Sequence, residues 1–326
     1  MGDDVFLTGA TGFVGSHVLR ELLEHGYTVR ALVRRDTRRL ATNGDVIAVR
    51  GDLRRPGDLV DAMRGCPYMV HTAAVYSFTL TDRGDMEEVN VQGTRGLLQA
   101  AHIAGVERAV VTSSSAAVGA ATNSVPATES QWGNSDDSAS VYHRSKVLQE
   151  RVALRAPLAV TTLLPTAPVG EGDHRPTPTG RMVLDVMQGR MWGTLGGGMN
   201  VVDVRDVARA HVLALERGQP GERYLAGGVN VSLLELFSLI ARVAHRRAPR
   251  VRVPYALAVV IGGIDGVRCR LLGGTPRVPL EGVRMGREHM YVSSEKAQHE
   301  LGYTSSPIQP AIERAVAWFR DHGYAA

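Results

Sequence analysis

A tyrosine and a lysine are spaced four positions apart in the segment SVYHRSKVLQERVALRA, as Tyr142 and Lys146. The segment reads as a helix over residues 140–156, so the two side chains share one face of it. A phenol with its ordinary pKa of about 10 transfers protons poorly at neutral pH, and a neighbouring ammonium lowers that pKa by stabilising the phenolate. The pair is therefore a candidate proton-transfer site.

A serine-rich segment lies upstream of this pair. The stretch ERAVVTSSSAAVG, residues 107–119, predicts a strand that runs into a loop holding Ser113, Ser114 and Ser115. A serine hydroxyl at such a strand end can orient a substrate oxygen beside the tyrosine. Because a tyrosine and a lysine at this spacing also occur on ordinary exposed helix faces, the interpretation depends on what the rest of the chain adds.

A glycine run near the start of the chain adds a cofactor signal. The apolar strand at residues 5–8 leads into Gly9, Gly12 and Gly15, and a second strand follows at residues 27–33. The segment between the glycines and this strand repeats apolar residues at helical spacing and ends at a glycine: Val14, Val18, Leu19, Leu22, Leu23 and Gly26. In a strand–turn–helix–strand unit, the first glycine permits the tight turn, the second admits a pyrophosphate, and the third lets helix and strand pack closely. We therefore predict a dinucleotide site.

Arginines follow the second strand, where the cofactor's ribose is recognised. An acid at this position bonds the 2′-hydroxyl of NAD, whereas an arginine suits the 2′-phosphate of NADP. Arg34 ends the strand and Arg35 follows it, with Arg38 and Arg39 close behind, and the nearest acid is Asp36. We predict NADP(H) as the cofactor, with a solvated basic loop as the alternative.

The first half continues to alternate between strand and helix patterns. Further strands are predicted at residues 45–53, 67–74, 107–119 and 158–170, with helices at residues 83–105 and 140–156. This alternation predicts an α/β protein with a Rossmann-type, doubly wound parallel sheet, whose ligand lies outside the carboxyl ends of the strands. The serine-rich loop falls at one of these ends.

We interpret residues 1–170 as an NADP-binding Rossmann domain and residues 171–326 as mainly a substrate-binding region that forms a smaller C-terminal lid. Segments near residues 201–228 are expected to return to the Rossmann sheet. The region is predicted to contain these elements: a loop at 171–180, helices at 181–190, 206–217, 232–246 and 308–322, a turn at 195–200, and a strand at 222–228.

Several residues outside the catalytic pattern have both a functional and a structural interpretation. Five residues are candidate pocket walls, although the pattern favours a core role for each: Tyr76, Phe78, Met182, Trp192 and Met199. Three arginines could bind an anionic substrate group or be surface charges: Arg175, Arg181 and Arg287. His71 is expected to be a packed strand-end residue and His143 a surface residue. No cluster has metal-ligand spacing, so no metal is expected.

The composition limits which class of partner and which cellular compartment we expect. The formal net charge is +4 and aromatic residues make up 5%, a balance that suits a small anionic ligand better than nucleic acid. Cys66 and Cys269 form no disulfide or metal pattern, and Asp3 and Asp4 stand where a signal peptide would be basic. We therefore expect a cytoplasmic protein, and leave open whether it is a homodimer.

An apolar stretch at residues 254–274, PYALAVVIGGIDGVRCRLLGG, is interrupted by Asp265, Arg268 and Arg270. Its uninterrupted apolar run is shorter than the roughly twenty residues that a membrane-spanning helix needs. We predict no integral membrane segment and interpret the stretch as a buried or subunit-facing helix. Peripheral membrane contact is the alternative.

Several motifs together resemble the extended form of the short-chain dehydrogenase/reductase superfamily. They cover about two thirds of the chain and are TGATGFVG, GDL, HTAA, VNVQGTRGLL, TSSSAAVG, YHRSK and VVDVRDVARAHVLALE. Two later segments, PTPTGRMVLDVMQGRMW and EGVRMGREHMYVSSEKAQHELGY, resemble the branch of dihydroflavonol-reductase-like and hopanoid-associated sugar epimerase-like proteins.

The resemblance implies a catalytic trio of Ser114, Tyr142 and Lys146, with Asn90 helping to position the lysine through a proton relay. Ser114 is chosen over Ser113 and Ser115 by its distance from Gly119. The implied cofactor-binding residues are Gly9, Thr11, Gly12, Phe13, Val14, Gly15, Arg34, Asp52, Leu53, Ala73, Ala74, Tyr142, Lys146 and Pro165.

We therefore predict an NADPH-dependent reductase of a ketone or aldehyde on a small-molecule substrate, with Tyr142 as proton donor. The substrate could belong to a secondary-metabolite or lipid pathway. The alternative is a nucleotide-sugar epimerase or dehydratase, in which the hydride leaves and returns. A third reading is a cofactor-binding regulator on an inactive enzyme fold, against which the intact trio argues. Arg34 favours the reductase, because epimerases that recycle their cofactor typically carry an acid there.

Overall fold

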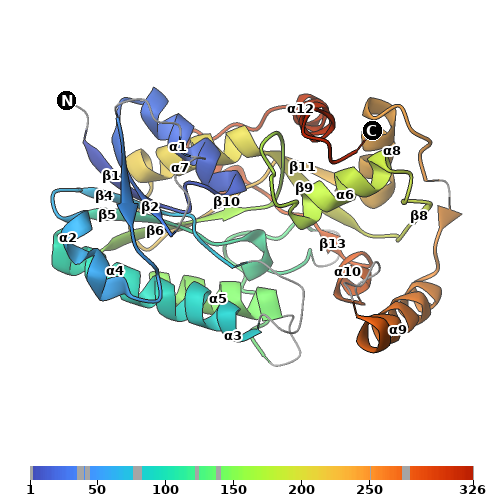
Figure 1. The fold of residues 1–326 in the computed structure, drawn as a ribbon, viewed down its shortest axis with the longest axis horizontal. Helices are drawn as coiled ribbons and strands as arrows, with labels where there is room; N and C mark the ends of the chain where they lie inside the picture. The colour runs from blue at the N-terminus through green and yellow to red at the C-terminus, as the bar shows by residue number, and fades with distance from the viewer. Residues whose placement is uncertain are drawn as a thin grey trace.

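A seven-stranded parallel sheet forms the centre of the protein in the computed structural model (Figure 1). The structure describes residues 3–34, 40, 45–75, 83–121, 125–136, 141–249, 251–273 and 280–325. The strand order is β10-β6-β5-β4-β1-β2-β3. The strands are β1 (Asp4–Thr8), β2 (Thr28–Val33), β3 (Val46–Arg50), β4 (Tyr68–His71), β5 (Arg108–Thr112), β6 (Ala159–Pro165) and β10 (Arg223–Ala226). The order reverses between β1 and β4, where doubly wound sheets bind ligands. The predicted Rossmann-type fold is confirmed.

The inner strands of the sheet are mostly apolar because helices cover both of its faces there. In β1, Val5 and Leu7 belong to the core on one face, whereas Phe6 belongs to the core on the other. The first face is covered by α1 (Phe13–Glu24), α7 (Val204–Arg217) and α11 (Glu295–Leu301). The second is covered by α2 (Val60–Met63), α4 (Thr94–Ala104) and α5 (Val141–Ala153) (Figure 1). α7 and β10 thus belong to the Rossmann layer.

The helix expected at residues 83–105 is divided. It consists of α3 (Arg83–Met86), a π-helical segment η3 (Glu87–Gly93) and α4. π-Helical turns are rare and often occur at functional sites. This one carries Asn90, which is fully buried. Gly96 in α4 packs against the ring of Pro56, and its lack of a side chain lets the helix lie close to η1 (Pro56–Leu59).

A second, smaller sheet lies beside the first and was not expected. It contains β7 (Ala167–Val169), β9 (Gly198–Asp203), β11 (Val229–Ser232) and β13 (His289–Met290). Its core is closed by α6 (Pro178–Met187), α8 (Leu233–Val243) and α12 (Ile308–Asp321). The chain crosses between the sheets at Thr166, so the strand expected over 158–170 is two strands, β6 and β7.

The turn expected at residues 195–200 is wrong in its second half, because Gly198 to Asn200 belong to β9. The preceding Gly197 packs tightly against the backbone of residues 286–288 and its N–H donates to Gly286 O at 3.0 Å. Tertiary pairing with β13 therefore overrides the turn preference of these glycines.

The apolar segment at residues 254–274 forms α9 (Tyr255–Leu272), followed by α10 (Leu280–Met285). It lies beyond the short strand pair β8 (Gly193–Thr194) and β12 (Val251–Arg252), at the end of the molecule away from the Rossmann sheet (Figure 1). The expectation of a buried helix is wrong, since Ile264 and Leu271 are 66% and 79% exposed. A subunit-facing role stays a prediction. Within the residues that the structure describes, none of the helices has the length and apolar character needed to cross a membrane.

Candidate active site at the carboxyl edge of the main sheet

The glycine turn after β1 requires two of its glycines for packing. Gly9 has a φ of +80°, and a Cβ there would lie 2.7 Å from the backbone nitrogen of Ala73. A Cβ on Gly15 would collide with the carbonyl oxygen of Gly9, so only glycine lets α1 begin this close to the turn.

Gly12 has a different environment, because it is exposed and a Cβ there would meet only the Gly9 carbonyl, at 3.2 Å. Gly12 is the N-cap of α1. Within this part of the described chain, no side chain caps the helix, and its first turn contains no acidic residue that could pair with the N–H groups at the helix start. Such N–H groups lack partners within the helix and attract anions. Thr11, Phe13 and Val14 are half-buried around this position. The turn therefore fits the pyrophosphate of a dinucleotide.

The residues expected at the adenosine end follow β2 and β3. Arg34 comes directly after β2 and is exposed, whereas Arg35, Asp36, Arg38 and Arg39 lie outside the described residues. Asp52 accepts a hydrogen bond from the backbone of Arg54 at 3.0 Å. Leu53 is buried, and its Cβ lies 3.4 Å from where a Cβ on Gly93 would be.

The residues expected further along the cofactor follow β4 and β6. Ala73 donates its backbone N–H to Thr8 Oγ1 at 3.3 Å, and Ala74 is exposed. Pro165 is buried at the end of β6. The next side chain, Thr166, has a buried hydroxyl oxygen without a hydrogen-bond partner among the described residues. An unsatisfied buried hydroxyl at this edge suits the polar part of a nicotinamide.

Ser114 and Tyr142 meet at the ends of β5 and α5. Ser114 caps the short 3-10 helix η4 (Ser115–Ala117), and its oxygen accepts from Ala116 N at 3.2 Å. A side-chain hydrogen bond joins it to the Tyr142 hydroxyl and lowers the pKa of that tyrosine. Ser113 instead donates to Glu150 Oε2 at 2.8 Å inside the protein. Of the three serines, it is Ser114 that contacts the tyrosine.

Burial dominates the protonation of Tyr142. It raises the pKa of the phenol to about 12, more than the hydrogen bond from Ser114 lowers it. The expected lowering of this pKa by Lys146 is not found, because the lysine ammonium donates elsewhere, to Gln149 Oε1 at 2.9 Å and to Thr112 O at 3.3 Å. Tyr142 is therefore a neutral phenol at pH 7, the form that can donate a proton.

Lys146 is almost fully buried, at 3% exposure. Burial lowers the pKa of its ammonium to about 8, and the nearby Glu150 carboxylate acts in the opposite direction. The lysine thus remains mostly charged at pH 7 but titrates close to it, within the range in which it could exchange a proton.

A buried chain of hydrogen bonds connects Lys146 to the strand that carries the glycine turn. Gln149 Nε2 donates to Thr94 Oγ1 at 3.0 Å, and Thr94 Oγ1 lies 2.9 Å from His71 Nε2. The other ring nitrogen, His71 Nδ1, lies 2.6 Å from Thr8 Oγ1. Burial, with a smaller effect of Lys146, lowers the pKa of His71 to about 3, so the ring is neutral. His71 is packed, as expected.

Asn90 lies next to this chain but is held by other partners. Its Oδ1 accepts from Val75 N at 2.8 Å, and its Nδ2 donates to Val75 O at 2.9 Å and Ser145 Oγ at 3.4 Å. The side chain that bonds Lys146 directly is Gln149, which was not among the expected residues. Its position three residues after Lys146 on the same helix was the available signal. A relay role for Asn90 stays a prediction.

A buried ion pair anchors α5 about two turns beyond Tyr142, on the same side of the helix. Glu150, fully buried, accepts from Arg223 Nε at 2.8 Å and from Thr162 Oγ1 at 2.9 Å. The Arg223 guanidinium also stacks over the ring of Trp132, 3.8 Å from its centroid. This cluster ties the helix that carries Tyr142 and Lys146 to β6 and β10.

His143 is not the surface residue that we expected. Its side chain is only partly exposed, and its ring meets that of Tyr142 edge-on at 6.1 Å. Burial lowers the pKa of the imidazole. The reason is that α5 packs along η3 and α3 at this end, which covers residues on both sides of Tyr142. Among the described residues, no group of three acidic, histidine or cysteine side chains could hold a metal.

The residues expected to line a pocket or to bind an anionic group do not come together at one site in the described part of the chain. Met182 and Met199 pack against the core of the small sheet, and Tyr76 and Phe78 lie outside the described residues. Arg175 and Arg181 are exposed, and Arg287 stacks over the ring of Tyr255.

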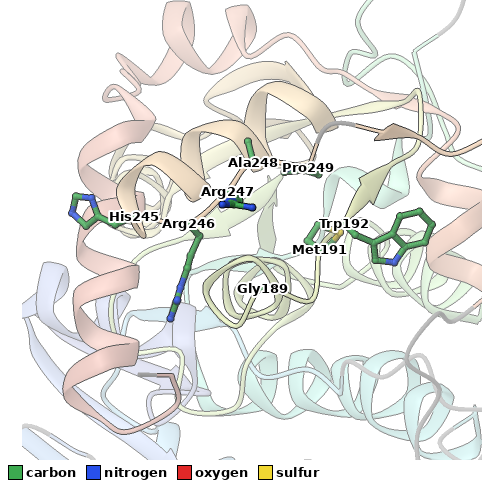
Figure 2. A pocket seen from close by; sticks show the side chains of 8 residues that line it. All are labelled: Gly189, Met191, Trp192, His245, Arg246, Arg247, Ala248 and Pro249. Atoms are coloured by element: carbon green, nitrogen blue, oxygen red, sulfur yellow. The ribbon is translucent and has the colours of Figure 1, made fainter.

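Trp192 lines a surface hollow of about 490 Å³ (Figure 2). Its lining residues are Gly189, Met191, Trp192, His245, Arg246, Arg247, Ala248 and Pro249. None of them belongs to the catalytic or cofactor set, and the hollow lies between the end of α6 and the segment after α8. It is therefore separate from the carboxyl edge of the main sheet.

Comparison with known proteins places this geometry among related enzymes. A model of the NAD dependent epimerase/dehydratase family matches residues 5–227, from β1 to the end of β10. A protein of Synechocystis sp. named as a dihydroflavonol 4-reductase is 39% identical over 332 residues, covering 99% of this chain and 96% of its own. Sterol demethylase protein B of Methylococcus capsulatus is 36% identical over 324 residues, covering 97% and 98%.

Two solved structures share the fold along the whole chain. The crystal structure of gox2253 has a TM-score of 0.87 at 39% identity and covers 100% of both chains. A nucleoside-diphosphate-sugar epimerase from Pseudomonas aeruginosa has a TM-score of 0.83 at 25% identity, again over 100% of both chains.

Proposed function

The chain belongs to the NAD dependent epimerase/dehydratase family, and we propose that it is an NADPH-dependent reductase of a ketone or aldehyde on a small molecule. It is an NAD(P)-dependent oxidoreductase of the extended short-chain dehydrogenase/reductase type. The observation that carries the proposal is the contact of a neutral Tyr142 phenol with the Ser114 hydroxyl at the carboxyl edge of the sheet.

Tyr142 and Ser114 would act together on the substrate oxygen. The Ser114 hydroxyl orients the carbonyl oxygen, and Tyr142 donates the proton that this oxygen takes up as the carbonyl carbon receives a hydride. The alcohol product thus gains one hydride and one proton. Lys146 would restore the proton to the tyrosine, because its pKa of about 8 lies close to neutrality.

The cofactor would lie along the same edge and supply the hydride. The N-terminus of α1 with Gly12 would hold its pyrophosphate, and Thr166 with Pro165 would line its nicotinamide side. Arg34 would bind a 2′-phosphate, which is why we propose NADPH. A guanidinium binds phosphate through charge-assisted hydrogen bonds, and it has no comparable partner on the bare ribose of NADH.

The names of the relatives support a reductase with an apolar, ring-containing or lipid-like substrate. The chain covers nearly the full length of both a protein named for dihydroflavonol reduction and one named for sterol demethylation. We propose a substrate of this size and apolarity, acted on in a reducing, cytoplasmic environment.

A second candidate is an epimerase or dehydratase, which the family description and the structural match to a sugar-nucleotide epimerase favour. In that reaction the hydride returns to the substrate, so the cofactor is not consumed. The exposed Arg34 after β2 argues for an exchangeable NADPH instead.

Deuterium transfer tests the proposal. The enzyme is incubated with NADPH carrying deuterium at the transferred position and with a panel of cyclic and long-chain ketones. A reductase gives an alcohol with one deuterium on the carbinol carbon, in an amount equal to the NADPH oxidised. Conversion of a substrate without net transfer of label would support the epimerase and contradict the reductase.

A further inference from the structure

Helix α9 concentrates the exposed apolar surface of this protein. Among the described residues, fifteen large hydrophobic side chains are exposed, and seven of them lie in this one helix. They are Leu257, Val259, Val260, Ile264, Val267, Leu271 and Leu272. Exposed apolar residues scattered singly are ordinary, but a continuous cluster marks a surface that contacts something.

Five of these residues form a single stripe, which we call the α9 apolar face: Leu257, Val260, Ile264, Val267 and Leu271. Their spacing alternates between three and four, so they lie on one side of the helix. The opposite side, with Ala258 and Gly262, is buried. α9 is therefore attached to the protein by its small residues and directs its large aliphatic residues into solvent.

The chain around this face is strongly basic. Residues 246–288 contain nine arginines against Asp265, Glu281 and Glu288, a net charge of +6, whereas the whole chain carries +4. Asp265 is already paired with Arg268 at 2.8 Å. Six of the arginines are exposed in the described residues: Arg246, Arg247, Arg252, Arg268, Arg284 and Arg287. Three of these arginines are at α9 itself: Arg268 is part of the helix, Arg284 is on the adjoining α10, and Arg287 stacks over the ring of Tyr255.

We propose that α9 and its surrounding arginines dock the protein onto an anionic lipid bilayer, with the helix lying in the plane of the interface. A helix that exposes aliphatic residues, with arginines nearby, binds such a surface through apolar burial and attraction to anionic headgroups. Arg268, on the edge of the stripe, can extend its charged end to the headgroups while its stem lies in the apolar layer.

A second copy of the chain fits this face less well. Pairing two α9 helices through the stripe would bring two regions of charge +6 together. Like charges at an interface repel, whereas the negative surface potential of an anionic leaflet complements the arginines. The charge therefore favours lipid over self-association, and this inference stands independently of the reaction that the enzyme performs.

Vesicle co-sedimentation tests the proposal with the full chain. The protein is mixed with phosphatidylcholine vesicles containing phosphatidylglycerol, and in parallel with vesicles of phosphatidylcholine alone. We expect binding to the anionic vesicles, weakened by high salt, and at least about tenfold weaker binding to the neutral ones, since each arginine near the surface adds attraction.

Ile264→Glu places a charge in the middle of the α9 apolar face and should reduce binding to anionic vesicles by about tenfold or more. The matched control is Ile103→Glu, which introduces the same charge at a 57% exposed position of helix α4 and should bind as the unmutated protein does. An unchanged circular dichroism spectrum and melting temperature show that both variants fold.

Three results would overturn the proposal. They are no binding to anionic vesicles, equal binding to neutral and anionic vesicles, and unaltered binding of Ile264→Glu. Loss of a dimer in Ile264→Glu, seen by light scattering in the absence of any lipid binding, would assign the face to a second copy instead.

Discussion

The ammonium of Lys146 donates a hydrogen bond to Gln149 Oε1 at 2.9 Å, one turn further along α5. Gln149 in turn donates to Thr94, from which the buried chain continues to His71 and Thr8. An uncharged acceptor in a buried site stabilises the charged lysine without neutralising it. We therefore expect Gln149 to act as a positioning residue for the lysine.

Two substitutions at Gln149 should move the titration of Lys146 in opposite directions. Gln149→Met removes the acceptor and should lower the lysine pKa below its value of about 8, while Gln149→Glu adds a negative charge and should raise it. We expect the alkaline limb of the kcat/KM profile to shift down in the first variant and up in the second. An identical limb in all three proteins would show that Lys146 or its contact with Gln149 does not control the reaction.

Arg34→Ala should remove the preference for NADPH. A charge-assisted contact with the 2′-phosphate contributes about 1.5–3 kcal/mol, or about ten- to a hundredfold in affinity. Dissociation constants for NADPH and NADH, measured by quenching of protein fluorescence, should differ by this factor in the unmutated protein and become similar in the variant. NADH affinity is the internal control and should not change. Equal affinities in the unmutated protein would exclude the assignment.

Tyr142→Phe removes the proposed proton donor and retains the ring. Turnover should fall by about 10² or more, the usual contribution of a positioned acid, while the dissociation constant for NADPH stays near its original value. Lys146→Ala should weaken both, because its ammonium is expected to reach the ribose. Undiminished turnover of Tyr142→Phe would refute the role of the tyrosine.

Buried histidines should make the protein sensitive to acid. Burial lowers the pKa of His211 to about 4, and its ring is held by Thr112 Oγ1 at 2.8 Å and Val207 O at 2.8 Å. Between pH 6.5 and 4 the unfolded chain binds a proton at this position that the folded one does not, so stability falls as the pH drops through this range. The loss is at most about 1.4 kcal/mol per pH unit for one histidine.

Urea unfolding at pH 7 and pH 5 measures this effect. His211→Gln should lower stability at pH 7 but lose less than the unmutated protein between the two pH values. His299→Gln, at an exposed position, is the matched control and should behave as the unmutated protein does. The same pH dependence in all three would show that His211 contributes nothing to it.

The main sheet could be predicted because its segments carry local signals. Apolar runs such as Val5–Thr8 alternate with helical periodicity, and Gly9, Gly12 and Gly15 mark the turn between them. The placement of the proposed catalytic trio could be predicted for the same reason, since Tyr142 and Lys146 are neighbours on one helix and Ser114 follows a recognisable strand; its catalytic role stays a prediction. Each of these features is encoded within a short stretch of sequence, so it can be recognised without knowing how distant segments pack.

The small sheet and the lysine's partner depend on contacts between distant segments. β9 is paired with β7, β11 and β13, which lie far from it in the sequence, and its first residue is a glycine in an apparent turn. Similarly, the hydrogen bonds of Gln149 to Lys146 and Thr94 form only because folding brings α4 next to α5. The exposure of α9 was missed because an apolar pattern alone does not tell a buried helix from one that faces an external surface.

The stoichiometry of NADPH and product decides whether the reaction consumes its cofactor, as we propose. The purified protein should carry little bound nucleotide, because the exposed Arg34 favours an exchangeable NADPH. With a ketone or aldehyde that it accepts, the absorbance of the reduced nicotinamide should fall by one equivalent for each alcohol formed. Tightly retained cofactor, together with conversion of substrate at constant absorbance, would contradict the reductase and identify an epimerase.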